Sequence, residues 1–221
     1  MNELIFIINT CLIGLTALGC LRMGSHALTT FIATQCILAN LFVIQQISLL
    51  HYNATCADPF TIGSVLSLNL LQEYYGRHKA RHAIWISFFM LIFYACSCLI
   101  VLAYLPHAFD TAHPHFFTLL NHMPRITLAS LFAYITVQHT ESFLYALLNH
   151  LFRGRYLVLR NCISISVCQL IDTILFSFLG LYGIVHSLHE IITTSYFIKI
   201  GALLLSIPFI AFSRRIKHGH S

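Results

Sequence analysis

Long apolar stretches, separated by short polar segments, follow one another along the whole chain. A helix needs about 20 mostly apolar residues, with a range of about 17–25, to cross the hydrocarbon core of a bilayer. The third stretch is the weakest, because it is short and becomes polar toward its end. The pattern predicts an all-α, polytopic membrane helix bundle with seven transmembrane helices, at about 4–21, 28–50, 60–76, 83–105, 126–148, 161–185 and 191–213.

The basic residues lie in every second loop of this arrangement. Ten of the twelve Lys and Arg follow the first, third, fifth or seventh stretch, and the intervening segments hold acids and only one basic residue, Arg125 at a helix edge. Positively charged loops stay in the cytoplasm, so the N-terminus is expected outside and the C-terminus inside. Six or eight spans would break the alternation. We therefore predict one multi-pass domain, residues 1–221, in the cytoplasmic (inner) membrane, oriented by Arg22, Arg77, Lys79, Arg81, Arg153, Arg155, Arg160, Arg214, Arg215 and Lys217.

The composition agrees with a membrane protein. Hydrophobic residues make up 58% of the chain and charged residues 9%, whereas about 25% of a soluble domain is charged. The net charge of +5 is therefore interpreted as a topology signal rather than as nucleic-acid binding. The eight cysteines form no CxxC pair, and the histidines in 107–115 match no familiar metal spacing. We expect neither a metal site nor a cofactor.

Four ionisable residues lie inside the predicted spans: Glu73, Glu141, Asp172 and Lys199. A charged side chain at the centre of a bilayer helix costs roughly 2.5–3.5 kcal/mol on insertion scales. Each belongs to a polar stripe at helical spacing, and lipid would not tolerate four such stripes. They are expected to face a common cavity, and comprise Asn69, Gln72 and Glu73; Tyr134, Gln138, Glu141 and Tyr145; Ser166, Gln169, Asp172 and Thr173; and Ser195, Lys199 and Ser206.

The alternative is that these groups only join helices to one another. Lys199 could simply neutralise Asp172 or Glu141, and the amides could form hydrogen bonds between helices. Three acids against one Lys leave a surplus carboxylate, however, which such a structural role does not require. A surplus buried acid is either protonated or available for a ligand.

Several motifs resemble the queuosine precursor transporters, a family similar to vitamin uptake transporters. The likeness extends over about 60–217, and the order and spacing of the motifs make it specific. The motifs are LNLLQEYYGRHKA (68–80), RITLASLFAYITVQHTE (125–141) and CQLIDTILF (168–176), followed by Lys199 and Pro208 in the last span.

The resemblance implies import of queuine or pre-queuosine bases across the cytoplasmic membrane for tRNA modification. It also implies a six-helix core similar to the substrate-binding components of energy-coupling-factor transporters, to which the first helix (4–21) would be an addition. Two residues depart from the family pattern, since Asn69 stands in place of Asp and Glu141 where Asp is more frequent. The functional positions that the resemblance implies are Glu73, Arg125, Gln138, Asp172 and Lys199.

The residue chemistry agrees with a 7-deazapurine substrate. The guanine-like edge of such a base presents two adjacent N–H donors that one carboxylate can accept together. Its carbonyl suits an amide donor such as Gln138 or Gln169. Its ring suits stacking on Tyr134, Tyr145 or a Phe. The hypothesis is that Glu141 or Asp172 binds the guanine-like edge, while Lys199 keeps the other acid ionised.

Other functions stay open at this point. The chain could be the substrate-binding component of an ATP-driven importer for another small heterocycle; since it has no GxxxxGK[ST] motif, an energising membrane partner would have to supply the ATPase. An intramembrane enzyme is disfavoured, because neither GxSxG nor HExxH occurs. A structural role in a larger membrane assembly predicts that the polar stripes tolerate Ala. We expect a small-molecule substrate and the lipid bilayer as partners, and no direct contact with nucleic acid.

Overall fold

The computed structural model of the 221-residue chain describes most of the backbone and side chains. The described residues are 1–49, 51–107, 109–152 and 157–201, without the side chains of 138, 141, 142, 145, 146, 149, 157–162 and 165.

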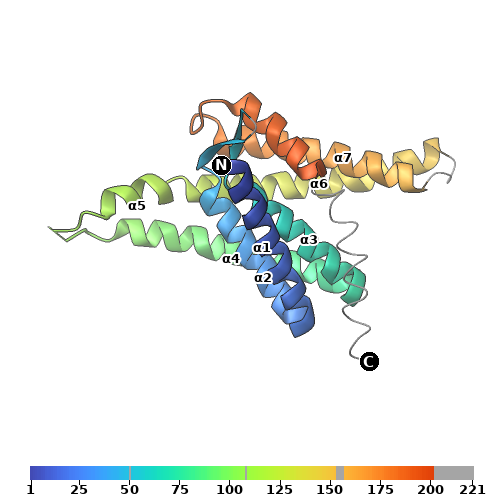
Figure 1. Ribbon diagram of the computed structural model, residues 1–221, viewed down its shortest axis with the longest axis horizontal. Helices are drawn as coiled ribbons and strands as arrows, with labels where there is room; N and C mark the ends of the chain where they lie inside the picture. Colours follow the sequence, from blue (N-terminus) through green and yellow to red (C-terminus); the bar gives the residue numbers. More distant parts are fainter. Residues whose placement is uncertain (50, 108, 153–156, 202–221) are drawn as a thin grey trace.

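Helices dominate the structure, and each of the seven predicted spans contains one (Figure 1). The last described helix, 188–201, begins three residues before the seventh predicted span and is unlabelled; residues 202–213 of that span lie outside the described residues. The labelled elements are α1 (Asn2–Met23), α2 (Ser25–Phe42), β1 (Gln46–Leu49), β2 (Tyr52–Thr55), α3 (Asp58–Tyr75), α4 (Arg77–Ala103), α5 (His113–Leu120), α6 (Met123–Leu151), α7 (Leu157–Phe176) and the π-helical turn η1 (Ser177–Leu181).

The predicted second span, 28–50, is wrong in its last third. The helix ends at Phe42, and β1 pairs antiparallel with β2, with Gln46 opposite Thr55. His51 has a left-handed φ of 69° at the turn, a conformation typical of tight turns. The apolar run was misinterpreted because a short hairpin can be as apolar as a helix. The all-α prediction therefore holds for the bundle but not for this segment.

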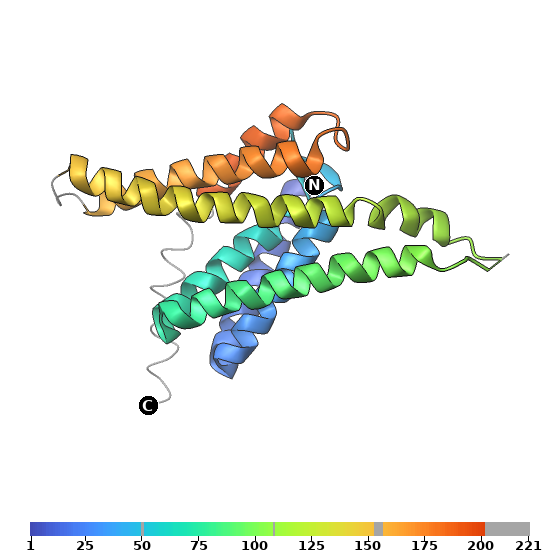
Figure 2. The same ribbon diagram turned by 180° about the vertical axis from the view of Figure 1, so that it is seen from behind.

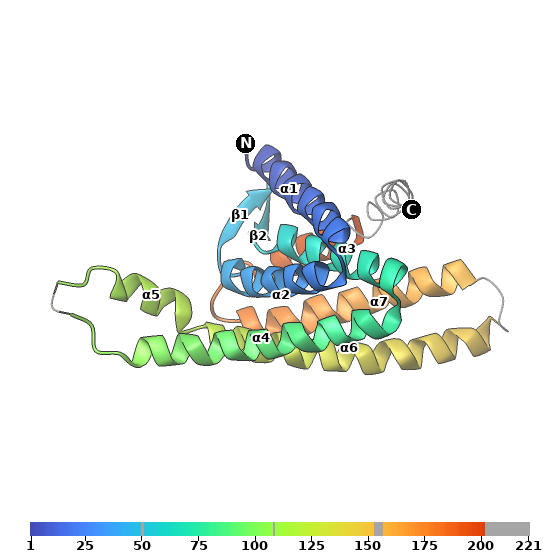
Figure 3. The same ribbon diagram turned by 90° about the horizontal axis from the view of Figure 1, so that it is seen from below.

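The helices form two groups that cross, α1–α3 and the pair α6 and α7, and α4 contacts members of both (Figure 1). The paired helices α6 and α7 run side by side in both opposite views, and α4 contacts α6, α2 and α3 (Figures 1 and 2). From below, α1, α2 and α3 pack together on one side of α4 and α6, while α5 extends beyond them at the end of α4 (Figure 3). The site described below lies where the two groups meet.

Two clusters of buried apolar side chains stabilise this arrangement. One joins α1, α2, α3 and α4 around Leu28, Leu70 and Leu71; the other joins the start of α6 to η1 and the last helix. In the first cluster, α3 packs so closely against α1 and α2 that a Cβ at Gly63 would collide with Ile13 on α1 and Gln35 on α2. Glycine is needed there for close packing rather than for an unusual backbone conformation.

Large apolar side chains also cover the outside of the bundle. On α1, Leu12 and Leu15 are 61% and 66% exposed, and on α4 Phe89 and Phe93 are 68% and 63% exposed. Such continuous apolar surface on a polypeptide indicates contact with lipid or another apolar partner. By length and composition, two of the described helices, α1 and α4, could cross a bilayer, and Ser166–Leu181 is a shorter apolar helix. The seven-span count and the orientation stay predictions.

Candidate functional site

An ion pair joins two of the polar stripes. The Lys199 ammonium donates to the Asp172 carboxylate, with Nζ 2.8 Å from Oδ2, and to the Thr173 hydroxyl at 3.1 Å. Neighbouring residues on α7 supply the acid and the hydroxyl, and helix 188–201 supplies the amine. The side chains of Lys199 and Asp172 are 14% and 32% exposed. The pair is therefore partly buried but still accessible.

A second acid, Asp58, lies at the start of α3 and is only 4% exposed. Its Oδ2 accepts hydrogen bonds from the Thr55 amide at 3.1 Å, the Thr55 hydroxyl at 3.3 Å and the Ser195 hydroxyl at 3.3 Å. Asp58 thus connects the hairpin to the last helix. Burial raises the pKa of the nearby Cys56 thiol, and the charge of Asp58 raises it further. At neutral pH this thiol consequently adds no negative charge to the site.

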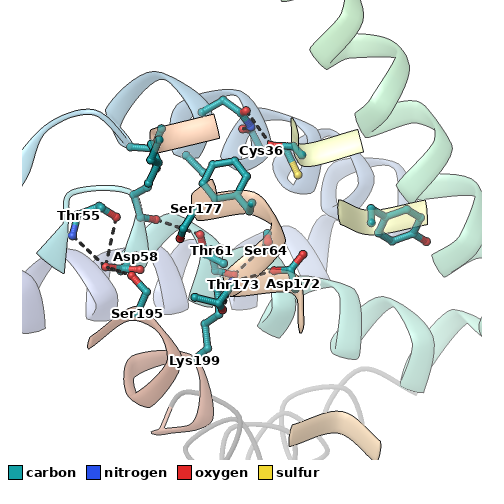
Figure 4. A pocket seen from close by; sticks show the side chains of 18 of the residues that line it. Cys36, Thr55, Asp58, Thr61, Ser64, Asp172, Thr173, Ser177, Ser195 and Lys199 are labelled. Atoms are coloured by element: carbon teal, nitrogen blue, oxygen red, sulfur yellow. Dashed lines mark hydrogen bonds and ion pairs between the residues drawn. The ribbon is translucent and has the colours of Figure 1, made fainter. Parts of the chain in front are cut away.

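Both acids line one cavity of about 220 Å³ between α2, α3, α4, α6, α7 and the last helix (Figure 4). Pockets for drug-sized ligands typically measure about 300–1,000 Å³, so this cavity suits a smaller molecule of one or two rings. Small hydroxyl side chains lie around the carboxylates in the close view, and these are Thr61, Ser64, Thr173, Ser177 and Ser195.

Aromatic and amide groups form another part of the wall. Tyr134 on α6 meets Phe88 on α4 edge to face, with ring centroids 4.5 Å apart. The side-chain oxygen of Asn40, on α2, accepts a hydrogen bond from the Ser130 hydroxyl at 3.1 Å. Its NH₂ group donates to the Cys36 carbonyl at 2.9 Å. The cavity therefore offers aromatic surface, hydrogen-bonding groups and charge together, a combination typical of sites for flat polar ligands.

The structure brings together three of the nine predicted site residues. Tyr134, Asp172 and Lys199 all line the cavity. Lys199 pairs with Asp172, which answers a question that the sequence left open. The side chains of Gln138 and Glu141 lie outside the described residues, so their position relative to the cavity stays a prediction.

Three further predicted residues are not among the described lining residues. Asn69 and Glu73 lie in the second half of α3, where Asn69 is half-buried and Glu73 exposed. Gln169 is half-buried on α7, and its backbone carbonyl accepts the Thr173 hydroxyl at 2.8 Å. Their role in binding stays a prediction, and the geometry gives it no direct support.

Arg125 lies in a structural position at the start of α6. Its guanidinium donates to the carbonyl oxygens of Leu179 and Tyr182, both at 2.8 Å. These carbonyls belong to η1 and the turn after it, where a helix end leaves acceptors without intrahelical partners. Arg125 therefore fixes the end of α7 and η1 against α6, at a place separate from the described cavity lining.

Replacement of Arg125 by Gln is expected to lower stability more than substrate affinity. A hydrogen bond from a charged group is worth about 1.5–3 kcal/mol, and less here because Arg125 is exposed. The loss of two such bonds should lower the thermal midpoint of unfolding in detergent. The measurement is thermal unfolding together with the KM for uptake. A raised KM at unchanged midpoint would instead assign Arg125 to the substrate.

Sequence reasoning missed Asp58, which it placed in an outer segment between spans. Asp58 precedes the apolar stretch by two positions, and only the folded hairpin brings Thr55 over it. Asn40 was also missed, although an amide within a predicted span was a usable signal. The hydroxyls of Thr61 and Ser64 at i, i+3 spacing marked the cavity face of α3, but polar residues this small are common in membrane helices.

A cavity that combines apolar walls with two acids and a lysine, between helices with apolar outer surfaces, is typical of one class: membrane proteins that bind a small solute. Comparison with known proteins agrees with this class. Residues 59–213 match the family described as "Putative vitamin uptake transporter". The chain is also 32% identical, over 190 residues, to a protein of Bacillus subtilis (strain 168) named "Probable queuosine precursor transporter".

That match covers 84% of this chain and 82% of the Bacillus protein. No solved structure matches the chain. The chain belongs to the vitamin uptake transporter family, and the family resemblance inferred from the motifs is confirmed. It is accordingly a membrane transporter.

Proposed function

We propose that this protein imports a queuosine precursor, a 7-deazaguanine base, across the cytoplasmic membrane. The observation that carries the proposal is the 32% identity to a protein named as a probable transporter of such precursors. The cavity supports it, because its volume of about 220 Å³ and its aromatic and charged lining suit a flat, two-ring base.

Asp172 is the acid that best fits the guanine-like edge. The described residues form one ion contact to its Oδ2, which leaves Oδ1 and the second lone pair of Oδ2 for two N–H donors. Lys199 balances the carboxylate charge, and Tyr134 and Phe176 contribute aromatic surface for the ring. Gln138, Gln169 and Glu141 stay candidate partners for the rest of the base.

The experiment measures queuosine in the tRNA of a bacterium that neither makes nor imports the precursors but retains the inserting and later enzymes. Expression of this protein, with a pre-queuosine base supplied at nanomolar concentration, should restore modified tRNA. The same host carrying an empty vector should stay unmodified.

Direct uptake of the labelled base into membrane vesicles separates transport from later metabolism. Absence of uptake by well-inserted protein would contradict the proposal. It would favour a different small heterocycle, as the vitamin description of the family allows.

A further inference from the structure

Two acidic side chains and one basic side chain line the described part of the cavity. Asp58 and Asp172 are acids, and Lys199 is the base. Lys199 lies 2.8 Å from Asp172 and hydrogen-bonds to Thr173 as well, so its charge is engaged on the α7 side. Among the described residues, no cation forms an ion pair with Asp58. Asp58 is therefore the acid of the cavity that has no ion-pair partner among the described residues, and burial raises the pKa of its carboxyl because it disfavours the charged form.

The two oxygens of Asp58 have different environments. All three hydrogen bonds from described residues reach Oδ2, which leaves Oδ1 without a described donor in a side chain that is only 4% exposed. A carboxylate oxygen can accept hydrogen bonds at both of its lone pairs, so Oδ1 has acceptor capacity that the described residues do not use. Because Asp58 lines the cavity, a bound ligand can reach this oxygen.

The spacing of the acids fits a single small ligand. Ser195 contacts Asp58 and Lys199 contacts Asp172, and these two residues are four positions apart on helix 188–201. That separation corresponds to about 6 Å along a helix axis. A ligand whose ring edge meets Asp172 can thus place a short substituent near Asp58.

We propose that Asp58 is a specificity-determining residue that selects 7-deazaguanine bases carrying a positively charged amine. The inference rests on the proposed function, since it concerns the substituent of the same base. The base would place its ring edge against Asp172 and its ammonium group against Asp58. The ammonium would give Asp58 the cationic partner that the described residues do not supply.

A structural role alone does not require a carboxylate at this position. The bonds from Thr55 and Ser195 fix the hairpin and the last helix through Oδ2, and an uncharged amide in place of the carboxylate could accept them with its oxygen. That amide would then present an NH₂ donor to the cavity where Asp58 presents an acceptor. Asp58→Asn therefore keeps the shape of the site while removing its charge.

The test compares two isosteric ligands, 7-aminomethyl- and 7-hydroxymethyl-7-deazaguanine, as competitors of labelled base uptake into membrane vesicles. The wild type should bind the cationic aminomethyl base about tenfold or more tightly than the neutral hydroxymethyl base. Asp58→Asn should reduce this ratio to less than about threefold. Asp110→Asn, which changes an acid in an exposed loop, is the matched control and should keep the ratio.

The outcomes are distinguishable. Uptake of a base by wild type with equal affinity for the two ligands would overturn the inference and leave the proposed function standing. An unchanged ratio in Asp58→Asn would also overturn it. If Asp58→Asn does not accumulate in the membrane, the ratio of the two ligand affinities in the wild type still tests the inference. No uptake of any 7-deazaguanine would remove the proposed function and this inference together.

Discussion

Asp172→Asn is expected to abolish uptake of the base, while the protein still inserts and accumulates. The amide keeps the size of the side chain and an oxygen that the Lys199 ammonium can reach, so the fold loses little. It cannot accept two N–H donors from the guanine-like edge, because one of its groups is itself a donor. Uptake into vesicles, normalised to protein in the membrane, should fall by about a hundredfold, as expected from a lost charged contact of about 2.5–3 kcal/mol.

A double variant separates this functional role from a structural one. Removing one partner of a fully buried ion pair costs about 3–5 kcal/mol, and less for this partly exposed pair, whereas removing both can be nearly neutral. Lys199→Met alone should lower the thermal midpoint, and Lys199→Met combined with Asp172→Asn should recover much of it. Recovered uptake in the double variant would show that the pair only joins α7 to the last helix. We expect recovered stability without recovered uptake.

Helical periodicity predicted the parts of the site that depend on one helix at a time. Asp172 and Lys199 were identified because each is costly in an apolar span, and the structure pairs them. Tyr134 was found by its spacing on α6, and it lines the cavity. The cost of burying charge is a local property of the sequence, so it could be evaluated before the fold was known.

Contacts between distant segments could not be predicted in the same way. Asp58 is buried by Ser195, which is 137 residues away, and by a hairpin whose first strand the apolar pattern predicts as helix. Arg125 was assigned to the substrate through resemblance, whereas its partners are backbone carbonyls more than 50 positions away. The sequence indicates which face of each helix is polar, but it does not indicate which residues of different helices lie at the same level.

Thr61→Phe is expected to block uptake by filling the cavity. Thr61 is half-buried on α3 and lines the cavity, and its hydroxyl donates to the Ala57 carbonyl at 3.2 Å, one turn earlier in the chain. A Phe ring would occupy a large part of the roughly 220 Å³ in which the base must fit. Overfilling a packed core costs about 1–3 kcal/mol, but here the ring enters open space. Uptake should therefore fall at least about tenfold, equivalent to about 1.4 kcal/mol of lost binding, with little change in the thermal midpoint.

Thr16→Phe is the matched control for this experiment. Thr16 also lies in a helix and donates its hydroxyl to the carbonyl four residues earlier, at 2.8 Å, but it is exposed on α1 among apolar side chains. The same substitution there should leave both uptake and stability unchanged, because the ring adds to a surface that is already apolar. Normal uptake by Thr61→Phe, at equal protein level, would mean that the base does not pass through this cavity. Equal loss in both variants would indicate a general effect on insertion, so the contrast between the two positions is what assigns the cavity to transport.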